Sequence, residues 1–476
     1  MKQSIPAGHE TGLPPTGSLL SPLEIVDVSV EGQGLARHNG RVVFLDGGLP
    51  GAMVSAMVKR VTKKVIFADI VSVLNPSPHQ ISPACPHAGL CGGCLWQDFD
   101  LEAARQWKRN HISQCLARIG KAPDVQVFPV AASPAYVAMR NKMSFAFGPG
   151  QDESCLLGLR KRAAHDIVEV DSCLLQGELA MAVVAHVRKR ANELGLKAWI
   201  GEKEETGYLR HLVVHKALHA TPENSMLVEC ITGPPPRRGK AAGKDLADKL
   251  EQIGKELMQQ FGVTGFVHGV RLQKDELALA ERTFAVLGEA SYTETIGHLN
   301  LVVPHNAFLQ SNTAAATLLY ERIRQEAALQ GTECVWDLFC GIGSIGLFLA
   351  QDAGQVHGCE VAEQSVRAAR QNARRLGYDN CAFYRNDLAH GLGADLPPPD
   401  VIIMDPPRAG ISERLAGQLA QIKARTLLYV SCDAGTQARD VARLSSTWRA
   451  VRSYPVDMFP YTAHVENVLV LEPLHG

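Results

Sequence analysis

Three short motifs in the C-terminal part of the chain place reactive side chains at the ends of apolar segments: Asp405-Pro406-Pro407-Arg408, Ser431-Cys432-Asp433 and His464-Val465-Glu466. A thiolate adds to an electron-poor carbon, and a carboxylate can then remove a proton that the addition has made acidic. The motifs therefore predict covalent catalysis with Cys432 as the nucleophile and Glu466 as the base. His464 is the alternative base, and a buried structural cysteine is the alternative interpretation of Cys432.

A glycine-rich turn lies upstream of these motifs. The segment Gly341-Ile342-Gly343-Ser344-Ile345-Gly346 follows an apolar stretch and precedes a predicted helix, which is the arrangement of a nucleotide-binding turn. Glu360 ends the next apolar stretch, where a carboxylate can bind both hydroxyls of a ribose. These features predict a nucleotide cofactor and leave a nicotinamide dinucleotide and S-adenosylmethionine as alternatives.

The loop Asp405-Pro406-Pro407-Arg408 favours S-adenosylmethionine. Two consecutive prolines form a rigid extended turn without amide donors, which suits the positioning of a planar base or a methyl donor. A dehydrogenase has no evident need for such a loop, although a rigid connection that ends a strand is the simpler alternative. Gln310 precedes a predicted helix and is a candidate contact for the methionine end of the cofactor; capping of that helix is its alternative role.

A cysteine beside a methyl donor has a specific use. Carbon 5 of uracil is a poor nucleophile, and thiolate addition at carbon 6 converts the ring into an enolate that attacks a methyl sulfonium. A base must then remove the proton from carbon 5 before the thiolate leaves. Because Cys432 cannot reach these carbons inside a helix, we expect an unstacked uridine in an RNA loop, bound with an affinity that falls as salt rises.

The elements that must position these residues follow from the periodicity of the chain. From about residue 301, apolar strand segments alternate with helical segments, which predicts a parallel sheet. No helix separates the strands near 449–459 and 465–472, so they predict an antiparallel hairpin at the edge of that sheet. Because an antiparallel last strand begins where the parallel strands end, we expect Cys432, Asp405 and Glu466 to meet at one edge.

The fold class predicted from the whole chain is multidomain. Residues 1–21 read as a flexible tail, and 22–78 alternate as a small β-barrel, a shape that often binds oligonucleotides. Residues 79–300 predict a central α+β region, in which a helix near 100–120 is expected to pack on the catalytic domain. Residues 301–476 predict a Rossmann-like α/β catalytic domain.

The composition limits the partners. The 476 residues carry 48 Lys and Arg against 49 Asp and Glu, so RNA contact must come from local patches such as Lys59, Arg60, Lys63 and Lys64, whose alternative is a solvated hairpin. No apolar stretch is long enough to span a membrane, and the N-terminus lacks a signal-peptide pattern. We expect a cytoplasmic monomer that binds neither membrane nor DNA and whose 12 cysteines form no disulfides.

A cysteine cluster predicts a metal centre. Cys85, Cys91 and Cys94 have the spacing Cys-x5-Cys-x2-Cys with glycines between them, and Cys173 is the expected fourth ligand, with Cys155 as the alternative. Four thiolates suit zinc and an iron–sulfur cluster alike. The spacing is not Cys-x3-Cys-x2-Cys and the thiol route needs no electron, so we expect a structural role in ordering the RNA-binding region.

With these motifs in this order, the chain resembles the bacterial RNA uracil-5-methyltransferases, in particular the 23S rRNA type that carries an N-terminal TRAM domain and a [4Fe-4S] cluster. The resemblance covers nearly the whole chain, from the small barrel and the cysteine cluster to the final His464-Val465-Glu466. It implies an S-adenosylmethionine-dependent transferase that forms 5-methyluridine in 23S rRNA. It also implies that the metal centre is [4Fe-4S] rather than zinc.

The resemblance carries individual roles onto this chain. It implies Cys432 as the nucleophile and Glu466 as the base. The residues it implies as cofactor contacts, together with those of the glycine turn, are Gln310, Phe339, Gly341, Gly343, Ser344, Glu360, Asp387 and Asp405.

The sequence departs from the family pattern at three places. The family usually has Asn in place of Ser344, commonly has Asn-Pro in place of Asp433-Ala434, and commonly has His in place of Tyr461. We expect the acidic Asp433 to raise the pKa of the neighbouring thiol and to slow its addition.

Three other functions remain as alternatives. A tRNA uracil-5-methyltransferase is the nearest one, although such family members generally lack the barrel and the cysteine cluster. An enzyme that methylates an exocyclic amine would leave Cys432 and Glu466 without a role. A non-catalytic RNA-binding iron–sulfur protein that assists ribosome assembly would not need Cys432.

Overall fold

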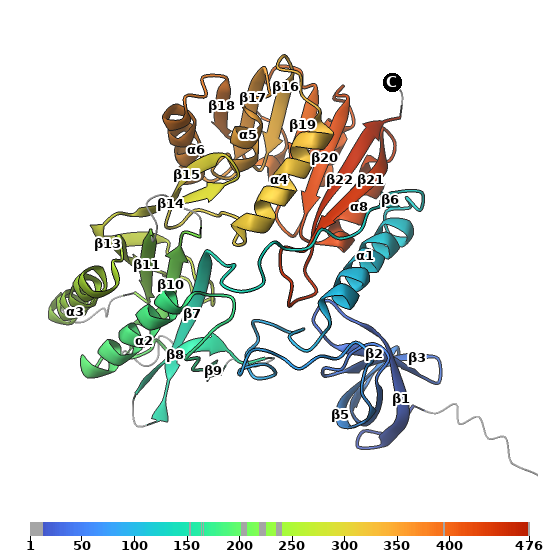
Figure 1. Ribbon diagram of the computed structural model, residues 1–476, viewed down its shortest axis with the longest axis vertical. Helices are drawn as coiled ribbons and strands as arrows, with labels where there is room; N and C mark the ends of the chain where they lie inside the picture. Colours follow the sequence, from blue (N-terminus) through green and yellow to red (C-terminus); the bar gives the residue numbers. More distant parts are fainter. Residues whose placement is uncertain are drawn as a thin grey trace, which may run out of the picture. The chain divides into compact units, whose positions relative to one another are not determined.

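The computed structural model describes residues 13–474 except 152–153, 163, 165, 201–206, 219–224, 235–239 and 394–395 (Figure 1). The chain forms two compact units. The first contains the residues up to Ala88 together with Cys94–Ala104 and Pro460–Ala463, and the second contains Gly89–Gly93, Arg105–Phe459 and the chain from His464 onward. Among the described residues, no helix is both long and apolar enough to cross a membrane.

The first unit contains a closed five-stranded barrel with the strand order β1-β2-β3-β5-β4. Its strands are β1 (Leu19–Val28), β2 (Gly34–His38), β3 (Arg41–Leu45), β4 (Met53–Val61) and β5 (Val65–Asn75). Alternate residues point inward, and Ile25, Val43 and Ile66 are fully buried. The predicted small barrel is therefore confirmed, but its first strand begins at Leu19, inside the segment expected to be tail; residues 1–12 lie outside the described part.

The central region of the second unit is a seven-stranded sheet with the order β13-β12-β11-β10-β7-β8-β9. The elements are β7 (Lys142–Pro149), β8 (Cys155–Arg160), β9 (Ile167–Val168), α2 (Glu178–Glu193), β10 (Leu209–Lys216), β11 (Met226–Thr232), α3 (Lys240–Phe261), β12 (Gly265–Val270) and β13 (Arg282–Gly288). The helices α2 and α3 contact each other and the sheet. At one edge, β13 exposes Phe284 and Val286, which are 61% and 41% accessible.

The catalytic region begins with a hairpin and a helix: β14 (Ser291–Ile296), β15 (Leu299–Pro304) and α4 (Thr313–Ala327). The hairpin packs against α4 and against the later helix α6 (Glu363–Leu376), and it also contacts β11 of the central sheet. Its inward residues Leu299, Leu301 and Val303 are fully buried. This hairpin therefore connects the central sheet to the catalytic core.

The catalytic core is an eight-stranded sheet with the order β18-β17-β16-β19-β20-β22-β21-β6. Its strands are β16 (Cys334–Leu338), β17 (Gln355–Glu360), β18 (Cys381–Arg385), β19 (Val401–Met404), β20 (Thr426–Ser431), β21 (Trp448–Val456), β22 (Glu466–Pro473) and β6 (Gln126–Val127). The five strands β16 to β20 are parallel to one another, whereas β22 is antiparallel to β20 and to β21. The predicted parallel sheet with an antiparallel hairpin is confirmed.

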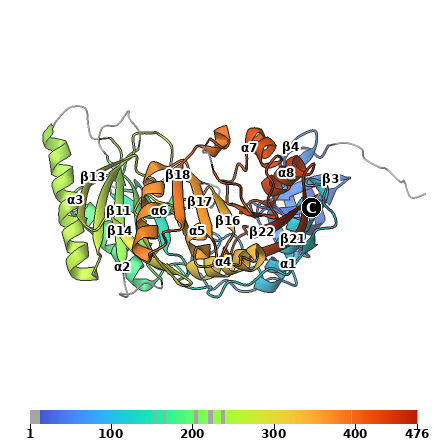
Figure 2. The same ribbon diagram turned by 90° about the horizontal axis from the view of Figure 1, so that it is seen from above.

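Helices cover both faces of this sheet, as the second view shows (Figure 2). One hydrophobic core contains residues of α4, α5 (Ser344–Leu349) and α6, and the other contains residues of α1 (Leu101–Arg118), α7 (Glu413–Leu419) and α8 (Ala434–Leu444). The central strands are buried on both sides, which explains their continuous apolar runs in the sequence. Rossmann-like layering is thus the observed architecture.

The short strand β6 is an element that the sequence analysis missed. It pairs in parallel with β21 through Arg452 and Gln126, so the hairpin is not the outermost part of the sheet. The preceding helix, α1, packs its residues Ile112 and Leu116 into the core on that side. A two-residue strand carries no periodicity of its own, so only the folded sheet defines it.

Candidate active site

The ends of neighbouring strands bring the predicted catalytic residues to one edge of the catalytic sheet. Asp405 follows β19 and Cys432 follows β20, its parallel neighbour. Because β22 is antiparallel and pairs Asn467 with Ser431, its first residue, Glu466, lies at the same edge. The topology expected from the sequence is therefore observed for all three residues.

Cys432 is a half-buried thiol among charged groups. Burial raises its pKa to about 11, and the negative charges of Glu466 and Asp405 contribute in the same direction. Arg408 opposes them, because the positive charge of its polar guanidinium favours the thiolate. Without substrate the side chain is therefore a thiol, and Arg408 is the group that favours its thiolate.

Glu466 is almost fully buried, at 3% exposure. Burial raises the pKa of its carboxyl group, and the charge of Asp405 raises it further, whereas Arg408 lowers it. Among the described residues, its Oε2 atom has no hydrogen-bond partner. The side chain is thus a carboxyl group of raised proton affinity with one oxygen still available.

His464, the alternative base, lies beside the same residues. Its Nε2 atom is 3.5 Å from Nη2 of Arg408, and its ring meets the ring of Phe459 edge to face. Burial and the charge of Arg408 lower the pKa of the imidazole. His464 is therefore neutral near pH 7 and remains chemically competent as a base.

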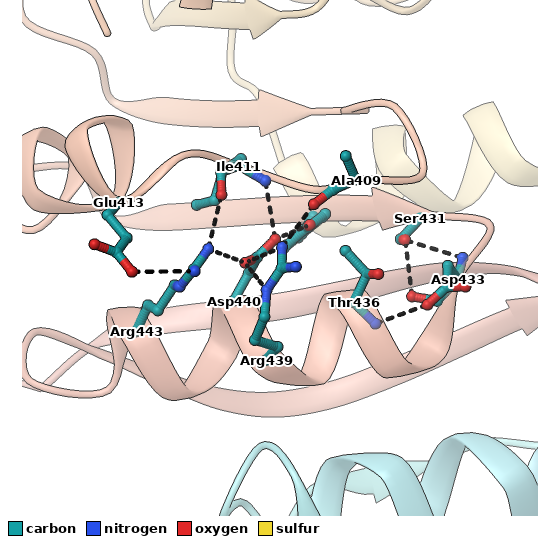
Figure 3. Close-up of polar contacts among 10 residues, drawn as sticks. Ala409, Ile411, Glu413, Ser431, Asp433, Thr436, Arg439, Asp440 and Arg443 are labelled. Carbon is teal, nitrogen blue, oxygen red and sulfur yellow. Dashed lines mark hydrogen bonds and ion pairs between the residues drawn. The ribbon is translucent and has the colours of Figure 1, made fainter. Parts of the chain in front are cut away.

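Asp433 has a different role from the one expected for it. Its carboxylate caps α8 by accepting the backbone N–H of Thr436 at 2.7 Å (Figure 3). The acidic groups that raise the pKa of Cys432 are instead Glu466 and Asp405. An aspartate at this position is explained by the start of the helix.

The glycine turn has the backbone that a cofactor turn requires. Phe339, Gly341 and Gly343 all have positive φ angles, of 64°, 54° and 78°. A Cβ atom at Gly343 would lie 2.8 Å from the ring of Phe383, whereas one at Gly341 would meet no atom within 4 Å. Gly343 is therefore required by packing, and Gly341 borders open space at the turn.

Two acidic residues hold this turn. Asp337 Oδ2 accepts the N–H of Gly346 at 2.8 Å, and burial raises the pKa of Asp337 to about 7. Glu360 accepts the N–H of Gly341 at 3.2 Å through Oε2 and the N–H of Ala362 at 2.8 Å through Oε1. Each oxygen of Glu360 keeps a second lone pair, which a ribose hydroxyl can use.

The other predicted cofactor residues lie around the turn with existing partners. The Ser344 hydroxyl is 2.8 Å from the hydroxyl of the buried Tyr320. Asp387 is exposed, caps a short 3-10 helix, η2 (Leu388–His390), and lies 2.9 Å from His390 Nδ1. Ser344 therefore has its hydroxyl engaged by protein, whereas Asp387 is accessible.

Gln310 is held through its backbone carbonyl, and its side chain influences the pKa of Asp405. It is buried, and its side-chain amide partly offsets the rise in pKa that burial gives the carboxyl group of Asp405. Its carbonyl oxygen accepts from Nδ2 of the fully buried Asn141 at 3.0 Å. The capping role considered for Gln310 belongs to Asn312, which accepts the N–H of Ala315 at 3.2 Å.

The predicted metal ligands are half-buried cysteines. Cys85 and Cys94 belong to the first compact unit, and Cys91 and Cys173 belong to the second. Cys155, the alternative ligand, is buried, which raises the pKa of its thiol to about 12. In the part of the chain that the structure describes, no three His, Cys, Asp or Glu side chains are arranged to hold a metal ion. The metal centre therefore remains a prediction.

Comparison with known families agrees with the domain order. Residues 22–71 match the TRAM domain, 331–426 match a family model described as a methyltransferase domain, and 398–473 match the model described as tRNA (uracil-5-)-methyltransferase. The last two models cover the glycine turn and the strand ends that carry Asp405, Cys432 and Glu466.

Similar proteins extend the match over almost the whole chain. An uncharacterized RNA methyltransferase of Nitratidesulfovibrio vulgaris is 38% identical over 457 residues, which cover 94% of this chain and 95% of the relative. One from Halalkalibacterium halodurans is 32% identical over 460 residues, covering 94% and 96%. The crystal structure of Pyrococcus abyssi tRNA (uracil-54, C5)-methyltransferase with S-adenosyl-L-homocysteine has the same fold, with a TM-score of 0.73 at 22% identity over 94% of this chain and 100% of that one.

The sheet, the glycine turn and these matches define an S-adenosylmethionine-dependent methyltransferase that carries a TRAM barrel. The order of the motifs, and relatives that match almost the whole chain, identify a family within this class of methyltransferases. The chain belongs to the RNA uracil-5-methyltransferase family.

Proposed function

We propose that the protein transfers a methyl group to carbon 5 of a uridine in 23S rRNA through a covalent bond between Cys432 and carbon 6. The observation that carries the proposal is the meeting of Cys432, Glu466 and Arg408 at one edge of the catalytic sheet. A thiol, a buried carboxyl group of raised pKa and a cation are the groups that this chemistry needs.

Each residue has one step in the proposed reaction. The Cys432 proton leaves to water, and the thiolate adds to carbon 6 while the electron pair of the 5,6 double bond moves toward carbon 5 and oxygen 4. S-adenosylmethionine supplies the methyl group that carbon 5 takes up. Glu466 first loses its own proton to water. As a carboxylate it then removes the proton from carbon 5, and the electrons of that bond restore the double bond as the thiolate leaves.

The cofactor residues are proposed from their place around the turn. Glu360 has free lone pairs for a ribose, Gly341 borders open space, Phe339 is half-buried at the same turn, and Asp387 is accessible. The amide of Gln310 favours the ionised form of Asp405, and Asp405 follows β19 at the edge of the sheet where Cys432 lies. The full proposed set also includes Gly343 and Ser344.

The outer face of the barrel supports an RNA substrate. Phe44 and Phe67 stack with ring centroids 5.4 Å apart, and the guanidinium of Arg60 lies 4.2 Å from the centre of the Phe67 ring. Lys63 and Lys64 are exposed in the adjoining turn. Aromatic faces beside cations favour single-stranded nucleic acid, since bases stack and phosphates pair with the charges.

The cysteine cluster is proposed as a structural [4Fe-4S] site with Cys85, Cys91, Cys94 and Cys173 as ligands. The close spacing of the first three supports it, as does the N–H of Gly93, which donates to the sulfur of Cys91 at 3.3 Å. Iron and sulfide determination after anaerobic purification, repeated on Cys91→Ser, tests the assignment. Absence of iron from the wild-type protein would contradict it.

A trapping experiment tests the function. Carbon 5 of 5-fluorouridine carries fluorine in place of the proton that Glu466 removes, so the reaction stalls with RNA attached to Cys432. With S-adenosylmethionine and fluorinated 23S rRNA fragments, we expect an adduct that survives denaturation and is absent from Cys432→Ala. The matched control is Cys381→Ser, a half-buried cysteine on β18.

The same experiment separates the alternatives. The matching family model and the Pyrococcus abyssi enzyme are both named for tRNA. An adduct with tRNA but none with 23S rRNA would move the substrate to tRNA. No adduct with either RNA, despite RNA binding by folded protein, would favour the non-catalytic alternative.

A further inference from the structure

The loop that leaves β19 turns sharply after Arg408. The N–H of Gly410 donates to the carbonyl of Pro407 at 2.7 Å, and Gly410 has a φ of 75°. A Cβ atom at Gly410 would collide with the carboxylate of Asp440. The backbone therefore approaches Asp440 as closely as glycine allows.

Asp440 joins the ends of two neighbouring strands. It lies in α8 and is fully buried. Its Oδ2 atom accepts the N–H of Ile411 at 2.9 Å and the hydroxyl of Tyr429 at 2.8 Å. Because Ile411 belongs to the loop after β19 and Tyr429 to β20, one oxygen atom links the segment that carries Arg408 to the strand that carries Cys432.

Two arginines of the same helix complete this link. Arg439 and Arg443 donate to Oδ1 of Asp440, with nearest distances of 2.8 and 3.1 Å (Figure 3). The same side chains reach the loop, where Arg439 donates to the carbonyl of Ala409 at 2.7 Å and Arg443 to that of Ile411 at 2.9 Å. The buried charge of Asp440 is thus paired, and the loop is held at three backbone atoms.

We propose that Asp440 is a positioning residue for methyl transfer, which with Arg439 and Arg443 fixes the loop after β19 so that Arg408 faces the sulfur of Cys432. The proposal rests on the function proposed for Cys432. Arg408 is exposed, with Nη2 of its guanidinium 3.5 Å from Nε2 of His464, and the contacts at Ala409 and Ile411 hold the backbone from which its side chain extends. Once the loop is released, Arg408 turns to solvent and the thiol keeps only acidic neighbours.

The charged groups that act on Cys432 make this testable. They are Glu466 and Asp405, which disfavour the thiolate, and Arg408, which favours it. Alkylation by iodoacetamide requires the thiolate, and mass spectrometry of the Cys432 peptide separates it from the other cysteines. For Asp440→Asn we expect alkylation at pH 8 to slow by about tenfold and kcat to fall, while the Kd for S-adenosylhomocysteine changes by less than about twofold.

A second variant and a control keep the test decisive. Arg439→Gln removes the contact with Ala409 from a side chain that is 41% exposed, so it tests the proposal even if Asp440→Asn unfolds. Arg324→Gln is the control, because it breaks an Arg–Asp pair with Asp352 elsewhere in the same domain. Unchanged alkylation of Cys432 in folded Arg439→Gln and Asp440→Asn would overturn the proposal.

Failure of the proposed function gives a different result. If wild-type protein methylates no uridine, the kcat comparison is lost, but alkylation still reports whether Asp440 positions Arg408. If Cys432→Ala abolishes methylation while the Asp440 and Arg439 variants behave as wild type, the function stands and the positioning role is refuted.

Discussion

Asp405 and Glu466 come from strands that run in opposite directions, yet the charge of Asp405 raises the pKa of Glu466. Burial acts on both carboxyl groups in the same direction. Two such groups do not ionise independently, because the first negative charge makes the second more costly. The amide of Gln310 favours the ionised form of Asp405, so Glu466 is the member of the pair that holds a proton more firmly.

Replacement of Glu466 by Gln should trap the reaction after methyl transfer. The amide cannot remove the proton from carbon 5, so the thiolate cannot leave. We expect a covalent adduct with unmodified RNA on a denaturing gel and at least about a hundredfold slower release of methylated RNA. Glu472→Gln, at the other end of β22, is the control and should turn over normally. Normal product release by Glu466→Gln would move the role of base to His464.

The pH dependence of Cys432 should change with Arg408. Because burial raises the thiol pKa to about 11, alkylation of wild-type Cys432 should rise about tenfold per unit between pH 7 and 10. Arg408→Gln removes the charge that lowers this pKa, so alkylation at each pH in that range should be about threefold to tenfold slower. Arg408→Lys, which keeps the charge, should lie between the two. Equal rates for Arg408→Gln and wild type would contradict the assignment.

Asp337 should make stability depend on pH. Its folded-state pKa of about 7 lies above the unfolded value, so the folded state holds the extra proton between pH 4 and 7 and loses that advantage as pH rises. Relative to wild type, Asp337→Asn should gain about 3 kcal/mol of unfolding free energy between pH 5 and pH 8. Urea denaturation of both proteins at the two pH values measures this, and a constant difference would refute it.

The buried ion pair between Lys108 and Asp457 should behave as a unit. Both side chains are fully buried, with Nζ and Oδ1 2.6 Å apart. Lys108→Met leaves the charge of Asp457 buried and unpaired, which should cost about 3–5 kcal/mol of unfolding free energy. The double variant Lys108→Met, Asp457→Leu should recover most of that loss in urea denaturation. Purely additive effects of the two substitutions would show that the charges do not depend on each other.

The turn between β4 and β5 should contribute to salt-dependent RNA binding. Lys63 and Lys64 are exposed there, whereas the nearby Lys59 is paired with Asp69 at 2.8 Å. Replacing both Lys63 and Lys64 by Ala should lower the slope of log affinity against log salt by about 1.4 for a single-stranded RNA. Lys59→Ala is the matched control with a smaller effect. An unchanged slope in the double variant would place the RNA elsewhere.

The positions of the strand ends could be predicted from the sequence because their signal is local. The apolar runs before Asp405 and Cys432 mark buried strands, and the missing helix before Glu466 marks the antiparallel one. The glycine turn was recognised for the same reason, since positive φ at Gly341 and Gly343 restricts the residue type. Features that are encoded within a few neighbouring residues could therefore be predicted from the sequence.

Features that depend on residues far apart in the chain could not be predicted from the sequence. Arg408 stands in a recognised motif, but its contact with Cys432 requires two strands to be neighbours. The carboxyl group that Gln310 influences belongs to Asp405, 95 residues away, and Asp440 looks in the sequence like any other polar residue of an amphipathic helix. A cation beside a nucleophilic thiol is the one signal that could have identified Arg408.

The barrel and the central sheet differ in whether they leave an open edge. The barrel is closed, whereas the seven-stranded sheet ends at β13, whose outer edge pairs with no other described strand and exposes Phe284 and Val286. An open edge with apolar side chains is a template on which a second chain can add a strand. Self-association of concentrated or heated protein should therefore begin at β13, at residues that take no part in the proposed chemistry.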